Sequence, residues 1–211
     1  MEESRKCDQA NGRADPSQPD TPCRFFQVLL IASTFALSWV GMMVVHEFGH
    51  VLFAWASGGM VARVVLSPLE FSRTDLQKNP HPLFVAWGGA LVGTVLPLGI
   101  SLLWRAFRWP AWYVLQFFAG FCLVANGVYL GVVSFMANAA DPADLMREGA
   151  PQWVLVLFGL VAFPSGLFLW NRLGTHFGLS EARGRVDRRV AIAVFFVLVA
   201  IVAAEILTYA G

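Results

Sequence analysis

ALSWVGMMVVHEFGHVLFAW, residues 36–55, places an H-E-x-x-H motif inside a long apolar run. His46 and His50 lie four residues apart, so on a helix both imidazoles project from one face and can reach one metal ion. Glu47 lies between them, where a carboxylate can polarise a water molecule at that ion. Ionisable side chains are costly to retain among apolar residues, and this cost indicates that the motif has a function.

The composition is that of a membrane protein. Of the 211 residues, 57% are hydrophobic and 14% are charged, whereas a soluble domain has about half apolar and about a quarter charged residues. The sequence therefore predicts an all-α fold, a polytopic transmembrane helical bundle of about five spans in the lipid bilayer. The net charge of +1 lacks the strong basic excess that is typical of nucleic-acid-binding proteins. The cysteines form no C-x-x-C pair, which argues against a cysteine-based zinc site.

A polar tail precedes five apolar segments. Residues 1–24 contain three prolines and no apolar core, so we predict a disordered tail, followed by a membrane-embedded domain over residues 25–211. The last four segments have the roughly 20 residues of one bilayer crossing. The first is longer and must tilt, protrude or break, with Gly41 as its weak point. The segments cover residues 25–58, 82–104, 111–136, 152–171 and 190–210.

The connection between the first two segments has a β-prone stretch. Residues 61–66 read VARVVL and are followed by Ser67-Pro68, a pattern that favours a strand or hairpin over a helix. Its backbone groups cannot stay unpaired in lipid, so we expect it at the membrane interface or against protein. In the second and third segments, Gly89-x-x-x-Gly93 and Gly127-x-x-x-Gly131 predict close helix packing rather than a chemical role.

A catalytic zinc usually has three protein ligands, so the motif needs a partner from elsewhere. The next candidates along the chain, Glu70, Asp75 and His81, lie in the connection. Asp141 is the better candidate, because alternating spans bring the C-terminal ends of the first and third segments to the same side of the membrane. Asp144 shares that side and competes with it, although we expect Asp144 to be a helix cap or a solvated residue.

The predicted chemistry is hydrolysis at one zinc ion held by His46, His50 and Asp141. Glu47 is the expected general base, which takes a proton from water and passes it to the leaving amine. Two imidazoles and a carboxylate suit zinc, and the same ligands leave iron and manganese open.

These residues resemble the site-2 protease family of intramembrane zinc metalloproteases, in the small bacterial-type form without a PDZ domain. The resemblance implies zinc ligation by the two histidines and a distant aspartate, catalysis by the glutamate, a β-prone loop that presents substrate as an added strand, and a place in a bacterial cell membrane. It covers most of residues 36–150, through HEFGH, Gly58-Gly59, the β-prone loop, WGGA at 87–90 and the aspartate after the third span.

The chain departs from the family's pattern near the third ligand. The family has Asp-Gly there, preceded by N-x-x-P, whereas Asp141 is followed by Pro142. Asn126, deeper in the third span, could correspond to the family's substrate-orienting asparagine. Its distance from Asp141 along the sequence, however, departs from the family's pattern. We expect Asn126 to make an interhelical hydrogen bond.

The charges and the resemblance predict opposite orientations. With five spans, eleven lysines and arginines lie on the side of the N-terminal tail and four on the other, which places the tail in the cytoplasm and HEFGH near the outer face. The resemblance implies a site nearer the cytoplasm. A broken first segment would move the site inward and leave the charges nearly balanced, at eight against seven.

Three functions compete for this sequence. The leading one is a zinc endopeptidase that hydrolyses peptide bonds of membrane proteins. The second is a non-catalytic zinc-binding membrane scaffold, against which the intact Glu47 argues, because metal binding alone does not require it. The third is a metal transporter, which predicts further acidic or histidine residues along the bundle, and the other spans offer almost none.

Overall fold

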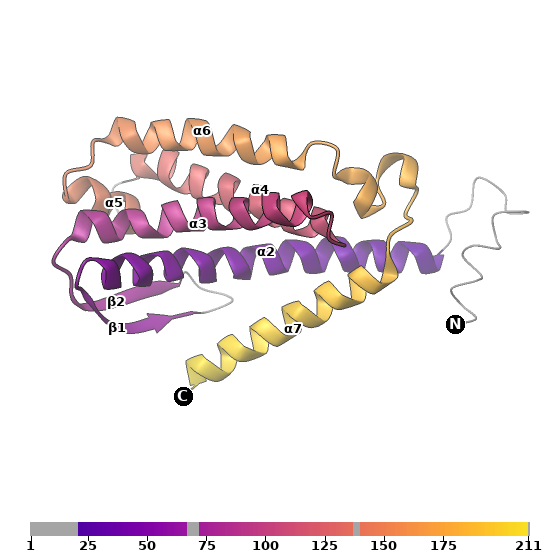
Figure 1. Cartoon of the computed structure of the whole chain (residues 1–211), viewed down its shortest axis with the longest axis horizontal. Helices are drawn as coiled ribbons and strands as arrows, with labels where there is room; N and C mark the ends of the chain where they lie inside the picture. The colour runs from indigo at the N-terminus through magenta and orange to yellow at the C-terminus, as the bar shows by residue number, and fades with distance from the viewer. Residues whose placement is uncertain (1–20, 67–71, 137–139, 211) are drawn as a thin grey trace, which may run out of the picture.

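Five long helices form an all-α bundle, as the sequence predicts (Figure 1). The structure is a computed structural model, and it describes residues 21–66, 72–136 and 140–210. Within these residues, five helices are long and apolar enough to cross a membrane, which identifies a membrane protein and confirms the predicted fold class. They are α2 (Thr21–Ala56), α3 (Pro82–Ala106), α4 (Trp112–Gly131), α6 (Gln152–Trp170) and α7 (Arg188–Ala210).

The first apolar segment is one continuous helix. α2 has 36 residues, so at about 1.5 Å per residue it is about 54 Å long and must tilt or protrude from roughly 30 Å of hydrocarbon. Gly41 lies inside the helix without interrupting it, so the alternative of a broken segment is wrong. The helix begins at Thr21, earlier than predicted, and the rest of the predicted disordered tail, residues 1–20, lies outside the described residues.

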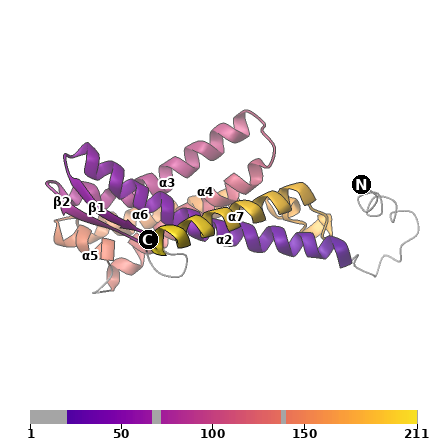
Figure 2. The same ribbon diagram turned by 90° about the horizontal axis from the view of Figure 1, so that it is seen from below.

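Successive long helices alternate in direction, so their connections gather at two ends of the bundle (Figures 1 and 2). One end, which we call the hairpin end, holds the C-terminal part of α2, the short helix α5 (Ala140–Arg147) and two strands. The opposite end, the arginine end, holds the start of α2, the α3–α4 connection, and the 3-10 helices η3 (Gly174–Phe177) and η4 (Ser180–Ala182).

The strands form an antiparallel hairpin between α2 and α3. β1 (Met60–Val65) is the predicted β-prone stretch, and it pairs with β2 (Arg73–Lys78). Gly58 ends the turn after α2 with a φ of +75°, a left-handed conformation that favours glycine. The Gly59 N–H then donates to the Ala54 carbonyl oxygen at 2.8 Å, which fixes the start of the hairpin against the helix.

Glycines let the helix backbones approach closely. A Cβ placed at Gly131 would lie 3.0 Å from Gly159 Cα, and one at Gly127 would lie 2.9 Å from the Phe163 nitrogen, so α4 and α6 touch along this stripe. The packing predicted for Gly127-x-x-x-Gly131 is therefore confirmed. α2 and α3 touch in the same way at Gly49 and Gly88, because a Cβ on Gly49 would collide with the Gly88 carbonyl oxygen.

The distribution of basic residues predicts how the bundle sits in the membrane. Since α2 is one span, eleven of the 15 lysines and arginines belong to the arginine end, counting those before α2. The remaining four belong to the hairpin end and are Arg63, Arg73, Lys78 and Arg147. From this asymmetry we predict that the arginine end lies in the cytoplasm and HEFGH toward the outer face.

Cysteine labelling tests this orientation. In a variant without native cysteines, we expect Glu148→Cys at the hairpin end to react with a membrane-impermeant maleimide in intact cells. Arg183→Cys at the arginine end should react only after lysis, because the bilayer shields it. Both positions are exposed. The reverse pattern would show that the hairpin end faces the cytoplasm, as the family resemblance implies.

Candidate metal centre

Both histidines of HEFGH lie on the inner face of α2, near its C-terminal end. The His46 and His50 side chains are buried and their ring centroids are 4.9 Å apart, as expected for residues one turn apart on a helix. Phe48, on another face of the same turn, is 45% exposed. This turn of α2 therefore directs its two imidazoles into the bundle and the Phe48 side chain outward.

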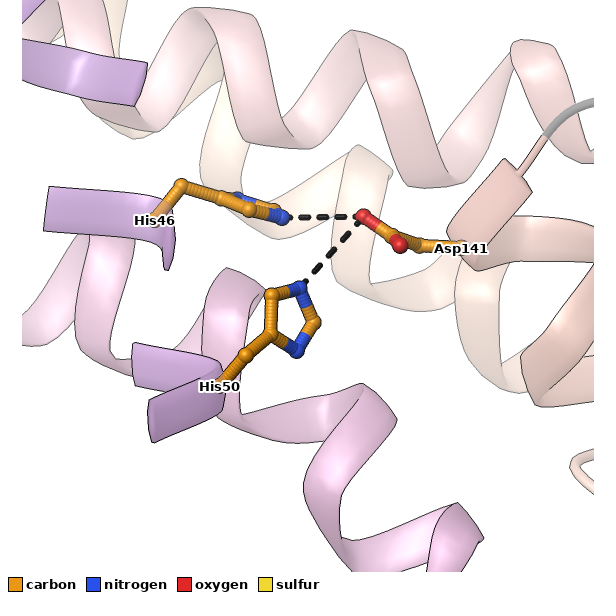
Figure 3. Close-up of side chains that lie close together, drawn as sticks. All are labelled: His46, His50 and Asp141. Atoms are coloured by element: carbon orange, nitrogen blue, oxygen red, sulfur yellow. Dashed lines mark hydrogen bonds and ion pairs between the residues drawn. The ribbon is translucent and has the colours of Figure 1, made fainter. Parts of the chain in front are cut away.

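Asp141 meets these two rings from the other side of the centre (Figure 3). Its Oδ2 atom lies 2.9 Å from His46 Nε2 and 3.7 Å from His50 Nε2. Asp141 is in the first turn of α5, and its N–H donates to the Tyr129 hydroxyl at 3.3 Å, which ties α5 to α4. The structure therefore brings His46, His50 and Asp141 together, with one ligand atom from each within 4.8 Å of the others.

Hydrogen bonds at the far side of each ring decide which nitrogen faces the centre. His50 Nδ1 lies 2.9 Å from the Val85 carbonyl oxygen, and His46 Nδ1 lies 2.8 Å from Asn126 Oδ1. The Asn126 amide is oriented by its own Nδ2–H, which donates to the Cys122 carbonyl oxygen at 2.9 Å. Since both oxygens can only accept, each Nδ1 carries the hydrogen, and the lone pair of each Nε2 points at Asp141.

Three electron-pair donors thus face one another in a buried space. Without a cation between them, lone pairs would face one another unless a ring carried a second proton at Nε2, and a buried imidazolium ion is costly. A divalent cation satisfies all three atoms at once. Two ligands of a tetrahedral zinc, each about 2.1 Å from the metal, lie roughly 3.4 Å apart, and the observed 2.9 Å and 3.7 Å separations fall on either side of that distance.

Gly89 of α3 keeps the space between the rings open. A Cβ on Gly89 would lie 2.5 Å from His46 Nε2 and would also collide with His50 Nε2. The close packing predicted for this glycine is confirmed, since a Cβ on Gly49 of α2 would lie 2.9 Å from Gly89 Cα, and its missing side chain also makes room at the ligand atoms. Gly93, one turn further along α3, lies against the Asn126 amide instead, with a Cβ-to-Nδ2 distance of 3.2 Å.

The charge of Asp141 suits a metal ligand. Burial alone would raise the pKa of its carboxyl, but the hydrogen bonds and positive charge that His46 and His50 supply when protonated outweigh burial and hold that pKa well below its usual range. Asp141 is therefore ionised at neutral pH. Asp144 is exposed and pairs with Arg147 at 2.5 Å on the outside of α5, away from the two rings.

Glu47 lies beside the histidines and is also buried. Its Oε2 accepts a hydrogen bond from the Thr74 hydroxyl of β2 at 2.7 Å. The other sequence candidates lie elsewhere: Asp75 pairs with Arg63 and Arg73 on the hairpin, and His81 is exposed at the start of α3. Glu70 lies outside the described residues.

Replacing Gly89 tests the space between the rings. We expect Gly89→Ala to lose stoichiometric zinc binding, because the new methyl group would occupy the position against both Nε2 atoms. Gly99→Ala is the matched control in the same helix, since a Cβ there meets no atom within 4 Å. Metal analysis of the two purified variants decides the matter, and full zinc occupancy in Gly89→Ala would contradict the site.

Replacing the two aspartates separately tests the third ligand. Asp141→Ala should weaken zinc binding by more than the roughly 10–100-fold that loss of a supporting hydrogen-bond partner costs. Asp144→Ala should leave zinc affinity unchanged, because Asp144 faces solvent. Competition with a chromophoric chelator measures both affinities, and equal values for the two variants would remove Asp141 from the ligand set.

Comparison with known proteins identifies no relative of this chain. No protein-family model matches the chain, and neither a curated protein nor a solved structure is significantly similar to it. The resemblance to site-2 proteases therefore rests on the motif residues themselves, and the metal centre rests on its own geometry.

Proposed function

We propose that this protein is an intramembrane zinc endopeptidase that hydrolyses peptide bonds of membrane proteins. The observation that carries the proposal is the convergence of His46 Nε2, His50 Nε2 and Asp141 Oδ2 beside a buried glutamate. Binding a metal requires the three ligands alone. Hydrolysis also requires a general base, and the buried carboxylate of Glu47 next to the ligands can serve as one.

The ligand set favours zinc over other divalent ions. Two neutral imidazoles and one carboxylate form the three-ligand arrangement of catalytic zinc sites, which leave one position for water. Manganese and magnesium prefer more oxygen ligands, and iron remains the nearest competitor. When bound, the ion supplies Lewis-acid chemistry, which polarises a carbonyl and lowers the pKa of water.

The chain's own residues supply the proton transfers. Glu47 takes a proton from the attacking water, whose oxygen forms a bond to the carbonyl carbon of the scissile peptide. Glu47 then gives that proton to the amide nitrogen as the carbon–nitrogen bond breaks. Asn126 and the Val85 carbonyl hold the two imidazoles in the tautomer that leaves each Nε2 free.

The location of the site defines the class of substrate. HEFGH lies inside a candidate membrane span, and the hairpin lies at the end of that helix. A substrate must therefore come from the membrane or its surface, in a bacterial cell membrane if the family resemblance holds. A substrate helix must unwind locally, because carbonyl groups inside a helix already accept hydrogen bonds.

The two alternatives have less support. A non-catalytic scaffold gives no reason for a buried Glu47 beside the ligands. A transporter needs further ligand groups along a path, and across residues 21–66, 72–136 and 140–210 the histidine, cysteine and acidic side chains form only the one cluster.

The Glu47→Gln variant tests the proposal. We expect it to keep zinc and to lose cleavage of single-span proteins in proteoliposomes by at least about a hundredfold, because the amide cannot accept the proton. Glu181→Gln, an exposed change at the arginine end, is the matched control and should cleave normally. Chelation should abolish cleavage and added zinc should restore it. Equal cleavage by the Glu47→Gln variant and the unmodified protein would refute the mechanism.

A further inference from the structure

The hairpin contacts the metal centre through one side chain. Thr74, on β2, donates its hydroxyl hydrogen to Glu47 Oε2 at 2.7 Å, across 27 positions of sequence. We propose that Thr74 is a positioning residue that fixes the Glu47 carboxylate for proton transfer, so that the hairpin completes the catalytic site. This inference rests on the protease function proposed above.

The Glu47 carboxylate needs such a partner. Its residue is only 5% exposed, and a buried carboxylate is stable only where donors replace the lost water. Among the described residues, Thr74 is the hydrogen-bond donor that the structure gives it. Glutamate also has several rotatable bonds, and a single hydrogen bond at Oε2 restricts them while Oε1 remains the oxygen for proton transfer.

The hairpin controls the direction of the Thr74 hydroxyl. Threonine branches at Cβ, so its first side-chain torsion has few accessible values in a strand. The backbone of Thr74 is fixed in turn by its pairing with Val64 of β1. The position of the donor therefore follows from the register of the hairpin rather than from α2, which carries Glu47.

The hydrogen bond acts on both halves of the reaction. In the first half, an O–H bond of water breaks, its proton binds Glu47 Oε1, and the water oxygen bonds to the carbonyl carbon. In the second half, the carbon–nitrogen bond breaks and the nitrogen takes the proton from Oε1. Thr74 keeps its own proton throughout, and its role is to hold the carboxylate in one orientation while the proton moves in and out.

Thr74 is not required to attach the hairpin to α2. The Gly59 N–H and the Ser57 hydroxyl both donate to the Ala54 carbonyl oxygen, at 2.8 Å and 3.0 Å, where the chain leaves the helix. The pairing of β1 with β2 and the contacts of Asp75 with Arg63 and Arg73 hold the hairpin itself together. Removing one hydroxyl therefore leaves these attachments in place.

Substitution of Thr74 in the full-length, zinc-loaded protein tests the proposal. Thr74→Val keeps the shape and removes the donor, whereas Thr74→Ser keeps the donor. We expect Thr74→Val to lower kcat on a single-span substrate by about tenfold to a hundredfold, the cost typical of losing a group that orients a reactive one, with KM and zinc content unchanged. Thr74→Ser should restore most of kcat. Thr175→Val, an exposed change at the arginine end, is the matched control.

An infrared measurement tests the contact apart from activity. The carboxylate stretch that disappears in Glu47→Gln should shift in Thr74→Val and return in Thr74→Ser. An unshifted band, or a normal kcat in Thr74→Val while Glu47→Gln is inactive, would overturn the role of Thr74 alone. A rise in KM with kcat unchanged, or a loss that serine does not rescue, would also overturn it. Normal cleavage by Glu47→Gln would overturn the proposed function and this inference together.

Discussion

Three lone pairs that face one another inside an apolar bundle are the constraint on which the rest of this structure depends. His46, His50 and Asp141 each offer an acceptor atom to the same buried space. Such an arrangement is stable only around a positive charge. The surrounding polar contacts follow from it, because Asn126 and the Val85 carbonyl fix the hydrogens on the outer nitrogens and so keep the inner ones free.

Glycines next to this centre make room for it in the bundle. Gly89 leaves room between the rings, and the adjacent residues Gly49 and Gly88 let α2 and α3 meet at backbone distance. Without a hydrophobic driving force between helices in lipid, such close contact and interhelical hydrogen bonds supply much of the attraction. The Asn126–His46 hydrogen bond serves both purposes, since it joins α4 to α2 and orients an imidazole.

Local sequence patterns predicted the parts of the site that depend on one helix. The spacing of His46 and His50 requires only helical periodicity. The alternation of spans placed Asp141 and Asp144 on the same side as the motif, but it did not choose between them. The β2 strand, RTDLQK, could not be predicted in the same way, because it has few β-branched residues and forms by pairing with β1.

Other roles depend on contacts between elements far apart in sequence. The predicted interhelical hydrogen bond of Asn126 is present, but its partner, His46, is 80 positions away and carries no local signal. The packing of Gly89 was predicted from its small-residue spacing, but its position against the two Nε2 atoms was not, because that contact depends on how α3 lies against α2. Thr74 lies on a strand that the sequence did not reveal, so its contact with Glu47 was inaccessible for the same reason.

The placement of Asp141 on a separate short helix gives the ion a mechanical role. α5 follows a segment outside the described residues, and its Asp141 is 95 positions from His46. An ion held by both would act as a reversible cross-link that closes this loop, as a disulfide does in a secreted protein. The loop contains all of α3 and α4, so zinc would link α2 to α5, the short helix that follows the third span. Loss of the ion would therefore loosen the bundle at the hairpin end.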